Sequence, residues 1–214
     1  MRIAIVGGTG AMGFGLALRL AKAGHEVRLG SRQSAKATAA AARARELTGR
    51  DGIVGETNAA ALTEATMAIL TVPGTAHLGT LRALADPLRR LPVLDVSVPM
   101  AFGPLRYDPP PEGSNAAQTL AVLGEGARVV AAFHSIAASL LTPIDAPMEA
   151  ETLMVGDDKD AKRAVGALAE QIGVTAHDAG PLRFAATIEA LTPLLIGMNR
   201  RYSRPHVGIR LTGL

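Results

Sequence analysis

A chain of 214 residues, 48% of them hydrophobic and 19% charged, can bury a substantial core as one domain or as one large and one small domain. The formal net charge is only +3, its 22 basic residues are scattered along the chain, and aromatic residues make up only 3%, so we expect no nucleic-acid partner. Cysteine is absent, which excludes disulfides, thiolate metal sites and a cysteine nucleophile, and favours a cytoplasmic location.

Secretion, membrane insertion and metal binding are also disfavoured. The first predicted strand begins at Arg2, which leaves no room for a signal peptide, and no apolar run approaches the roughly 20 residues needed to span a bilayer. The histidines show no metal-ligand spacing, and the acidic run from Asp157 to Asp160 is more typical of a helix start than of a cation site. We therefore expect neither a membrane partner nor a metal.

Short β-branched runs alternate with Ala- and Leu-rich helical stretches. Strands are predicted at Arg2–Val6, Glu26–Leu29, Met67–Val72, Val93–Ser97, Arg128–Phe133 and Thr152–Val155. Helices are predicted near Met12–Ala23, Ser34–Leu47, Ala76–Arg89, Asn115–Leu123 and Asp160–Ile172. This alternation favours an α/β fold of Rossmann type, with a doubly wound, mostly parallel sheet.

The pattern changes in the last third of the chain. The Pro- and Gly-rich segment Gly103–Gly113 indicates a surface loop, and from about Ala179 the sequence predicts one long apolar helix with no strand after it. We divide the chain into a Rossmann domain, residues 1–140, and a small C-terminal helical lobe, residues 141–214.

An apolar stripe marks the long C-terminal helix. It consists of Ile188, Leu191, Leu194 and Leu195 at helical spacing, and Pro193 within it should kink the helix or free a backbone carbonyl. The stripe either packs onto the chain's own sheet or lies at a homodimer contact.

The segment GGTGAMG, residues 7–13, joins the first strand to the first helix. Gly8, Gly10 and Gly13 form G-x-G-x-x-G, with a second strand within about thirty residues. Gly8 is expected to permit the turn, Gly10 to let the backbone approach a pyrophosphate, and Gly13 to let the helix pack on its strand. The phosphates would face free N–H groups at the helix N-terminus, so this loop predicts a dinucleotide site.

The end of the second strand predicts which dinucleotide is bound. An NAD site would place a carboxylate there to bind the ribose 2′-hydroxyl, but the chain has Ser31 and Arg32, with Lys36 one helical turn further on. A guanidinium can form a paired contact with a 2′-phosphate, which favours NADP.

Three further strand ends are candidates for the rest of the site, because ligands of doubly wound sheets bind outside the carboxyl ends of the strands. Val72 and Pro73 end one strand, and Val98 and Pro99 end another, where the backbone turns and a nicotinamide ring could lie. His134 lies just beyond a third strand, and its position leaves a structural and a functional role equally open.

Several of these segments together resemble one family. They are MRIAIVGGTGAMGFGLALRLAKAGHEVRLGSR, the strand ends LTVP and VSVP, AAFHSIAA, VGDD and DAGPL…EALTPLL. In this combination, nearly end to end, the chain resembles NADPH-dependent coenzyme F420 reductases. The resemblance implies reversible hydride transfer between NADP and a 5-deazaflavin, with the C-terminal lobe helping to enclose the deazaflavin, and it favours the homodimer.

The resemblance also implies roles for individual residues. The adenosine and phosphates would be bound by Thr9, Gly10, Ala11, Met12, Ser31, Arg32 and Lys36. The nicotinamide would be bordered by Val72, Ala76, Val98 and Ala138. The deazaflavin side would be lined by His134, Ile136, Thr192 and Val207. No residue is expected to act as an indispensable acid or base, because hydride transfer between two stacked rings depends chiefly on positioning.

Two positions depart from the family pattern and keep other functions open. Ala186 and Ala190 stand where an arginine and a serine are expected, so the deazaflavin pocket has fewer polar contacts. One alternative is an NADPH-dependent reductase of a small imine, ketone or acid, which would need a proton donor near its substrate. The other is a non-catalytic NADP-sensing module.

Overall fold

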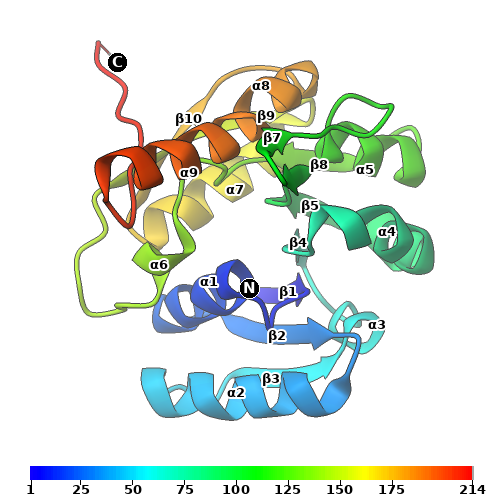
Figure 1. Ribbon diagram of the computed structural model, residues 1–214. Helices are drawn as coiled ribbons and strands as arrows, with labels where there is room; N and C mark the ends of the chain where they lie inside the picture. Colours follow the sequence, from blue (N-terminus) through cyan, green and yellow to red (C-terminus); the bar gives the residue numbers. More distant parts are fainter. Residues whose placement is uncertain (214) are drawn as a thin grey trace.

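One eight-stranded sheet organises the fold in the computed structural model, which describes residues 1–213 (Figure 1). The strands lie in the order β10-β9-β8-β5-β4-β1-β2-β3. Their bounds are β1 Arg2–Val6, β2 Glu26–Ser31, β3 Ile53–Thr57, β4 Met67–Leu70, β5 Pro92–Asp95, β8 Arg128–Ala131, β9 Ala150–Gly156 and β10 Val174–Asp178. Every neighbouring pair is parallel except β8 and β9, which confirms the mostly parallel α/β fold.

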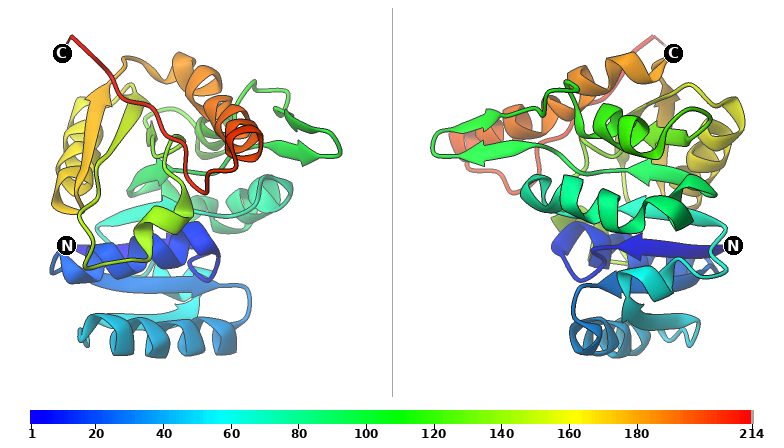
Figure 2. Two further views of the ribbon diagram at one scale, coloured as in Figure 1. Left: turned by 60° about the vertical axis from the view of Figure 1, so that its left-hand side comes forward. Right: turned by 90° about the vertical axis from the view of Figure 1, so that its right-hand side faces the viewer.

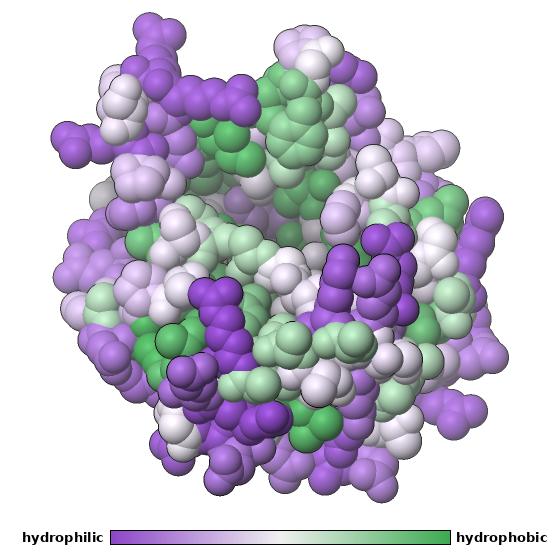
Figure 3. Space-filling view, turned by 60° about the horizontal axis from the view of Figure 1, so that its bottom comes forward, coloured by the Kyte–Doolittle hydropathy of each residue, from purple (hydrophilic) through white to green (hydrophobic). Residues whose placement is uncertain are grey.

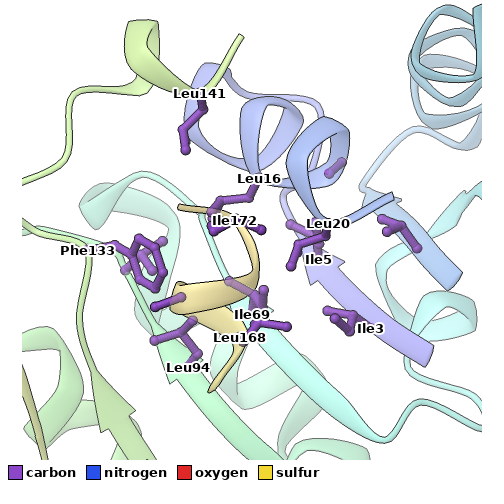
Figure 4. Close-up of a cluster of buried hydrophobic side chains, with 14 of the residues drawn as sticks. Ile3, Ile5, Leu16, Leu20, Ile69, Leu94, Phe133, Leu141, Leu168 and Ile172 are labelled. Atoms are coloured by element: carbon purple, nitrogen blue, oxygen red, sulfur yellow. The ribbon is translucent and has the colours of Figure 1, made fainter. Parts of the chain in front are cut away.

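Helices cover both faces of this sheet. Their bounds are α1 Ala11–Lys22, α2 Ser34–Thr48, α3 Asn58–Ala61, α4 Gly74–Arg89, α5 Asn115–Leu123, α6 Ala138–Leu141, α7 Lys159–Gln171, α8 Ala185–Glu189 and α9 Leu191–Tyr202. Because side chains alternate along a strand, β1 sends Ile3 and Ile5 into one core and Ala4 and Val6 into the other. Figure 4 shows the first core, where side chains of α1 and α7 meet those of β1, β4 and β5.

The strands that the sequence did not predict lie at the edges of the sheet or outside it. β3 and β10 are its two outermost strands. A glycine interrupts β3 at Gly55, where an added Cβ would lie only 2.0 Å from the Ala37 carbonyl oxygen of α2. The predicted loop Gly103–Gly113 is also partly wrong, since β6 (Met100–Phe102) and β7 (Leu105–Tyr107) form an antiparallel hairpin.

The prediction of one continuous C-terminal helix is wrong. The segment divides into a 3₁₀ turn η1 at Leu182–Phe184, then α8, then α9. The break at Ala190 has a reason in Pro193, which has no N–H to donate to the carbonyl of Glu189 four residues earlier. Residues 141–214 also add β9 and β10 to the sheet, and their division from residues 1–140 stays a prediction.

Candidate functional site

A pocket with a volume of about 1090 Å³ lies at the carboxyl ends of β1, β2, β4 and β5. Many of the predicted site residues line it: Thr9, Gly10, Ala11, Met12, Ser31, Arg32, Lys36, Val72, Pro73, Ala76, Val98 and Thr192. None of the described residues that line the pocket is acidic. One face of the molecule is visibly hollowed near its centre, with hydrophobic and weakly polar side chains around the hollow (Figure 3). The pocket suits an anionic ligand that also has apolar parts.

The glycines of the loop have roles that differ from the predicted ones. The left-handed backbone belongs to Gly7, with φ of +78°, and not to Gly8, whose N–H donates to the Ile5 and Gly30 carbonyls. Gly8 is required by close packing instead, since an added Cβ would lie 2.6 Å from Leu29. At Gly13 an added Cβ would lie 2.6 Å from Thr71 Oγ1, so the start of α1 packs tightly on the strand ends.

The N-terminus of α1 is free to bind an anion. Its N-cap, Gly10, makes no side-chain capping bond, and the N–H of Phe14 is the first to bond within the helix, to the Gly10 carbonyl. The N–H groups of Ala11, Met12 and Gly13 are therefore not used within the helix. Gly10 is exposed, and an added Cβ would meet only the Gly7 carbonyl oxygen at 3.7 Å, so the open side of the loop faces a ligand.

Two cations lie at the end of β2. Arg32 and Lys36 are exposed at the pocket, and within residues 1–213 neither forms an ion pair with a carboxylate. Ser31 is buried beside them, and its oxygen accepts the Gln33 N–H at 3.2 Å, which leaves the hydroxyl proton free to donate outward. A phosphate here would meet two uncompensated positive charges and a hydroxyl.

Asn58 is a pocket residue that sequence reasoning missed. Its Oδ1 accepts the Gly7 N–H at 3.2 Å and would lie 2.7 Å from a Cβ on Gly30, so it fits against both glycine-containing strand ends. Asn58 begins α3 directly after β3. The signal that could have found it was therefore the edge strand β3 itself.

The inner half of the pocket is apolar. Val72 and Pro73 follow β4, Val98 follows β5, and Ala76 lies in the first turn of α4. Pro99 is buried behind them, where it contacts Gly74 closely enough that an added Cβ there would lie 2.9 Å from the Pro99 Cα. The hairpin residues Met100 and Phe102 also line the pocket and were not predicted.

His134 lies beside this apolar half without lining the pocket. Its side chain is buried, and neither ring nitrogen has a hydrogen-bond partner among residues 1–213. Burial lowers the pKa of His134 to about 4, against smaller opposing effects of the Asp95 carboxylate and the Ser97 backbone. The imidazole is therefore neutral near pH 7. The residue before it, Phe133, has a positive φ of 71°, an uncommon backbone conformation that directs the chain after β8.

A buried polar network supports the end of β5. The Asp95 carboxylate contacts His77 Nε2 at 2.9 Å and accepts from Thr119 Oγ1 at 2.6 Å and from the Ser97 N–H at 3.0 Å. Burial alone would raise the pKa of Asp95, but His77 and the donors from Ser97 and Thr119 outweigh it and lower that pKa. Burial opposes charge on His77 too, yet the facing carboxylate raises its pKa. The network fixes Ser97, which lines the pocket.

The remaining predicted residues lie outside the pocket. Ile136 is buried, while Ala138 and Val207 are half-buried; the Val207 N–H donates to Asn199 Oδ1 at 2.6 Å. Ala186 and Ala190 do not line the pocket either. In residues 1–213, no helix is both long and apolar enough to cross a membrane, and no cluster of His, Cys, Asp and Glu could hold a metal ion.

Comparison with known proteins identifies close relatives. Residues 2–99 match the family model described as NADP oxidoreductase, coenzyme F420-dependent. The chain is 42% identical to the F420-dependent NADP reductase of Methanothermobacter thermautotrophicus over 222 aligned residues, which span 100% of this chain and 96% of the relative. It is also 42% identical to the F420-dependent NADP reductase of Methanocaldococcus jannaschii, over 100% of this chain and 99% of that one.

Solved structures share the fold. A protein from Arthrobacter sp. FB24, for which F420-dependent NADP reductase activity is proposed, superposes with a TM-score of 0.85 at 25% identity over 100% of both chains. A reductive aminase from Aspergillus terreus gives a TM-score of 0.65 at 21% identity, over 94% of this chain and 62% of that one, and this likeness shows the fold alone.

Proposed function

The chain belongs to the coenzyme F420-dependent NADP oxidoreductase family, and we propose that it transfers a hydride reversibly between NADP(H) and the 5-deazaflavin coenzyme F420. The observation that carries this proposal is the 42% identity over the whole chain with relatives named for that activity. The pocket supports it, because a phosphate-binding helix start, two free cations and an apolar inner half lie along one cleft.

We assign the NADP-binding side of the cleft to the ends of β1, β2, β4 and β5. Thr9, Gly10, Ala11 and Met12 would hold the phosphates at the start of α1, with Gly8 and Gly13 supporting the loop from beneath. Ser31, Arg32 and Lys36 would bind the 2′-phosphate, and Asn58 would fix the loop through Gly7. Val72, Pro73, Ala76, Val98 and Ala138 would border the nicotinamide, with Pro99 behind them.

We assign the deazaflavin side to the second part of the chain. His134, Ile136, Thr192 and Val207 would line it. Thr192 lines the pocket directly, and its hydroxyl donates to the His134 carbonyl at 2.7 Å. The unpartnered nitrogens of His134 would gain a hydrogen bond from or to the bound ring, which offsets the free-energy cost of their burial.

Positioning is the chemical task of these residues. When bound, the reduced nicotinamide supplies the hydride and the deazaflavin accepts it, or the reverse. Val72 and Val98 exclude water from the place of hydride transfer. His134 orients a ring as a neutral imidazole and adds no positive charge beside it. The described lining offers no carboxylate that could act as a general acid, which favours ring-to-ring transfer over reduction of an imine or carbonyl.

We further propose a homodimer and a cytoplasmic location. Leu194 is 58% exposed on α9, while Ile188 and Leu195 from the same predicted stripe are buried within the chain's own fold. The apolar surface available for a partner is therefore narrower than the sequence pattern predicted, and Leu194 marks it. The absence of cysteine supports a reducing compartment.

The experiment that tests the activity mixes the protein with NADPH and oxidised F420 and follows the absorbance of both. We expect both compounds to be consumed together with a strong preference for NADPH over NADH. Oxidation of NADPH by a cyclic imine or a ketone, without any reaction of F420, would assign the chain to the rival reductases. NADPH binding with no turnover of any of these compounds would assign it to the nucleotide sensors.

A further inference from the structure

Glu189 has an ionisable side chain in the protein interior, where charged groups are normally excluded. It is the last residue of α8, and its side chain is fully buried. One carboxyl oxygen, Oε1, accepts the Ala116 N–H at 3.0 Å. The other, Oε2, accepts the Asn115 N–H at 2.9 Å and lies 3.0 Å from the Tyr107 hydroxyl. Glu189 thus joins three elements: α8, the start of α5 and the end of β7.

The Tyr107 hydroxyl has more acceptors than protons. Its oxygen lies 3.0 Å from Glu189 Oε2 and also 3.0 Å from the Gly113 carbonyl oxygen. A phenol has a single proton to donate. If Glu189 is ionised, one of these two oxygen–oxygen contacts has no proton and is repulsive.

One additional proton satisfies every contact. With a proton on Oε2, Glu189 donates to the Tyr107 oxygen, and the Tyr107 hydroxyl donates to the Gly113 carbonyl. Oε1 still accepts the Ala116 N–H, and Oε2 keeps a lone pair for the Asn115 N–H. The arrangement of donors and acceptors is therefore complete for the neutral acid and incomplete for the carboxylate.

Burial and a neighbouring charge favour the neutral acid over the donors that contact it. Burial raises the pKa of Glu189 to about 7, and the Asp95 carboxylate of β5 adds to this effect, while the N–H groups of Ala116 and Asn115 and the Tyr107 hydroxyl oppose it. Burial and the same glutamate raise the pKa of Tyr107, so β7 faces Glu189 with a protonated phenol. His77 of α4, which is paired with Asp95, also interacts electrostatically with Glu189, while α5 faces Glu189 with backbone N–H groups.

Tyr107 connects this site to the wall of the cleft. In the β6–β7 hairpin Tyr107 pairs with Met100, and both Met100 and Phe102 line the pocket. Phe102 is 70% exposed, and both views of Figure 2 show the hairpin projecting beside α9. Asn115, whose N–H Glu189 accepts, also donates from Nδ2 to Ser97 Oγ at 2.9 Å, so the same contact reaches the end of β5.

We propose that Glu189 is a positioning residue that holds a proton: as a neutral acid it fastens Tyr107 and the base of the β6–β7 hairpin, and loss of this proton to solvent loosens the hairpin wall of the cleft. Ionised Glu189 competes with the Gly113 carbonyl for the Tyr107 proton, so one of the two anchors of the hairpin is lost. The protonation state is independent of the proposed function, whereas its effect on the second substrate rests on that function.

Infrared spectroscopy of the protein alone tests the protonation state, with uniform ¹³C-glutamate labelling to separate Glu from Asp bands. We expect a protonated-carboxyl band at pH 6 that titrates away towards pH 8.5 and is absent in Glu189→Gln at every pH. Glu170→Gln, which removes an exposed glutamate, should keep the band. In Tyr107→Phe the band should shift to higher frequency because its acceptor is gone. Absence of the band at pH 6, or its survival in Glu189→Gln, would overturn the proposal.

Steady-state kinetics tests the consequence for the cleft. The KM for oxidised F420 should rise roughly three- to tenfold from pH 6 to pH 8.5, as expected for the loss of one hydrogen bond, while the KM for NADPH changes little. Glu189→Gln and Tyr107→Phe should show a flat profile, and Glu170→Gln the profile of the parent protein. Equal pH profiles for the parent protein and Glu189→Gln would contradict the role in the cleft even if the infrared band is present.

Discussion

The hydroxyl of Thr192 donates to the main-chain carbonyl of His134 at 2.7 Å and so joins α9 to the segment that follows β8. Thr192 lines the pocket, and His134 lies directly behind it. If both position the second ring, neither is indispensable. We expect His134→Ala and Thr192→Ala each to slow single-turnover hydride transfer from NADPH to F420 by roughly ten- to a hundredfold, or about 1 to 3 kcal/mol. Complete loss in either single variant would identify an acid catalyst instead.

The same rate should not report an ionisation of His134 near neutral pH. Burial lowers the pKa of His134 to about 4, so the ring stays neutral from pH 5.5 to 8.5. Single-turnover rates of the parent protein at saturating substrates should therefore show no step that disappears in His134→Ala. A step near pH 6 to 7 that the variant lacks would show that the imidazole takes up a proton during turnover.

We expect the choice between NADPH and NADH to depend on Arg32 and Lys36, the two cations at the pocket after β2. Arg32→Asp places a carboxylate where we assign the 2′-phosphate, so it should weaken NADPH by about 2 to 3 kcal/mol relative to NADH. Arg50→Asp makes the same change of charge at an exposed residue outside the pocket and should leave the preference unchanged. The ratio of kcat/KM for the two nucleotides measures the effect, and an unchanged ratio in Arg32→Asp would exclude the assignment.

Close packing at the glycine loop gives a test that needs no second substrate. In Gly13→Ala the new Cβ would lie 2.6 Å from Thr71 Oγ1 and 2.7 Å from the Gly8 Cα, so the backbone must shift. We expect a loss of about 1 to 3 kcal/mol in the free energy of unfolding and weaker NADPH binding. Gly197→Ala in α9 meets open space and should be neutral or stabilising. Urea unfolding and NADPH fluorescence measure both effects; normal binding in Gly13→Ala would show that the loop tolerates the shift.

Glu189 should also make stability depend on pH. Its pKa is raised from the ordinary 4.5 to about 7 in the folded protein, so the folded state holds this proton more tightly than the unfolded state does. The free energy of unfolding should therefore fall as pH rises between these two values, by up to about 3 kcal/mol, and then level off. Urea unfolding from pH 4.5 to 8 should show this slope in the parent protein and in Glu170→Gln, but not in Glu189→Gln. Parallel curves for all three proteins would refute it.

Central elements of the fold were predictable from the sequence, and edge elements were not. Ile3 and Ile5 in β1 carry the strong apolar pattern of a strand buried on both faces, and the glycine loop marks where α1 begins. β3 and β10 are half-exposed edges, so burial does not impose such a pattern on them. The break before α9 depends on the missing N–H at Pro193, for which the sequence predicted a kink; the apolar stripe alone predicted a continuous helix.

The site was predictable where it lies on continuous segments. Ser31 ends β2, Arg32 and Lys36 follow it, and all three line one pocket, while their role stays a prediction. Asn58 and Phe102 were missed because tertiary contacts bring them to the pocket, where Asn58 meets the glycine loop across β2. Glu189, buried outside the pocket, was missed because it meets Tyr107 across 82 residues of chain. No local pattern marks a glutamate that will be buried opposite a tyrosine.

Isotope transfer tests direct hydride exchange most directly. NADPH carrying deuterium at both C4 positions is mixed with oxidised F420 and the protein, and the reduced deazaflavin is analysed by mass spectrometry before it can be reoxidised. Direct transfer between the two rings predicts one deuterium in each reduced deazaflavin and no loss of label to water. Reduced deazaflavin without the label, or NADPH oxidation that leaves F420 unreduced, would contradict the proposed function.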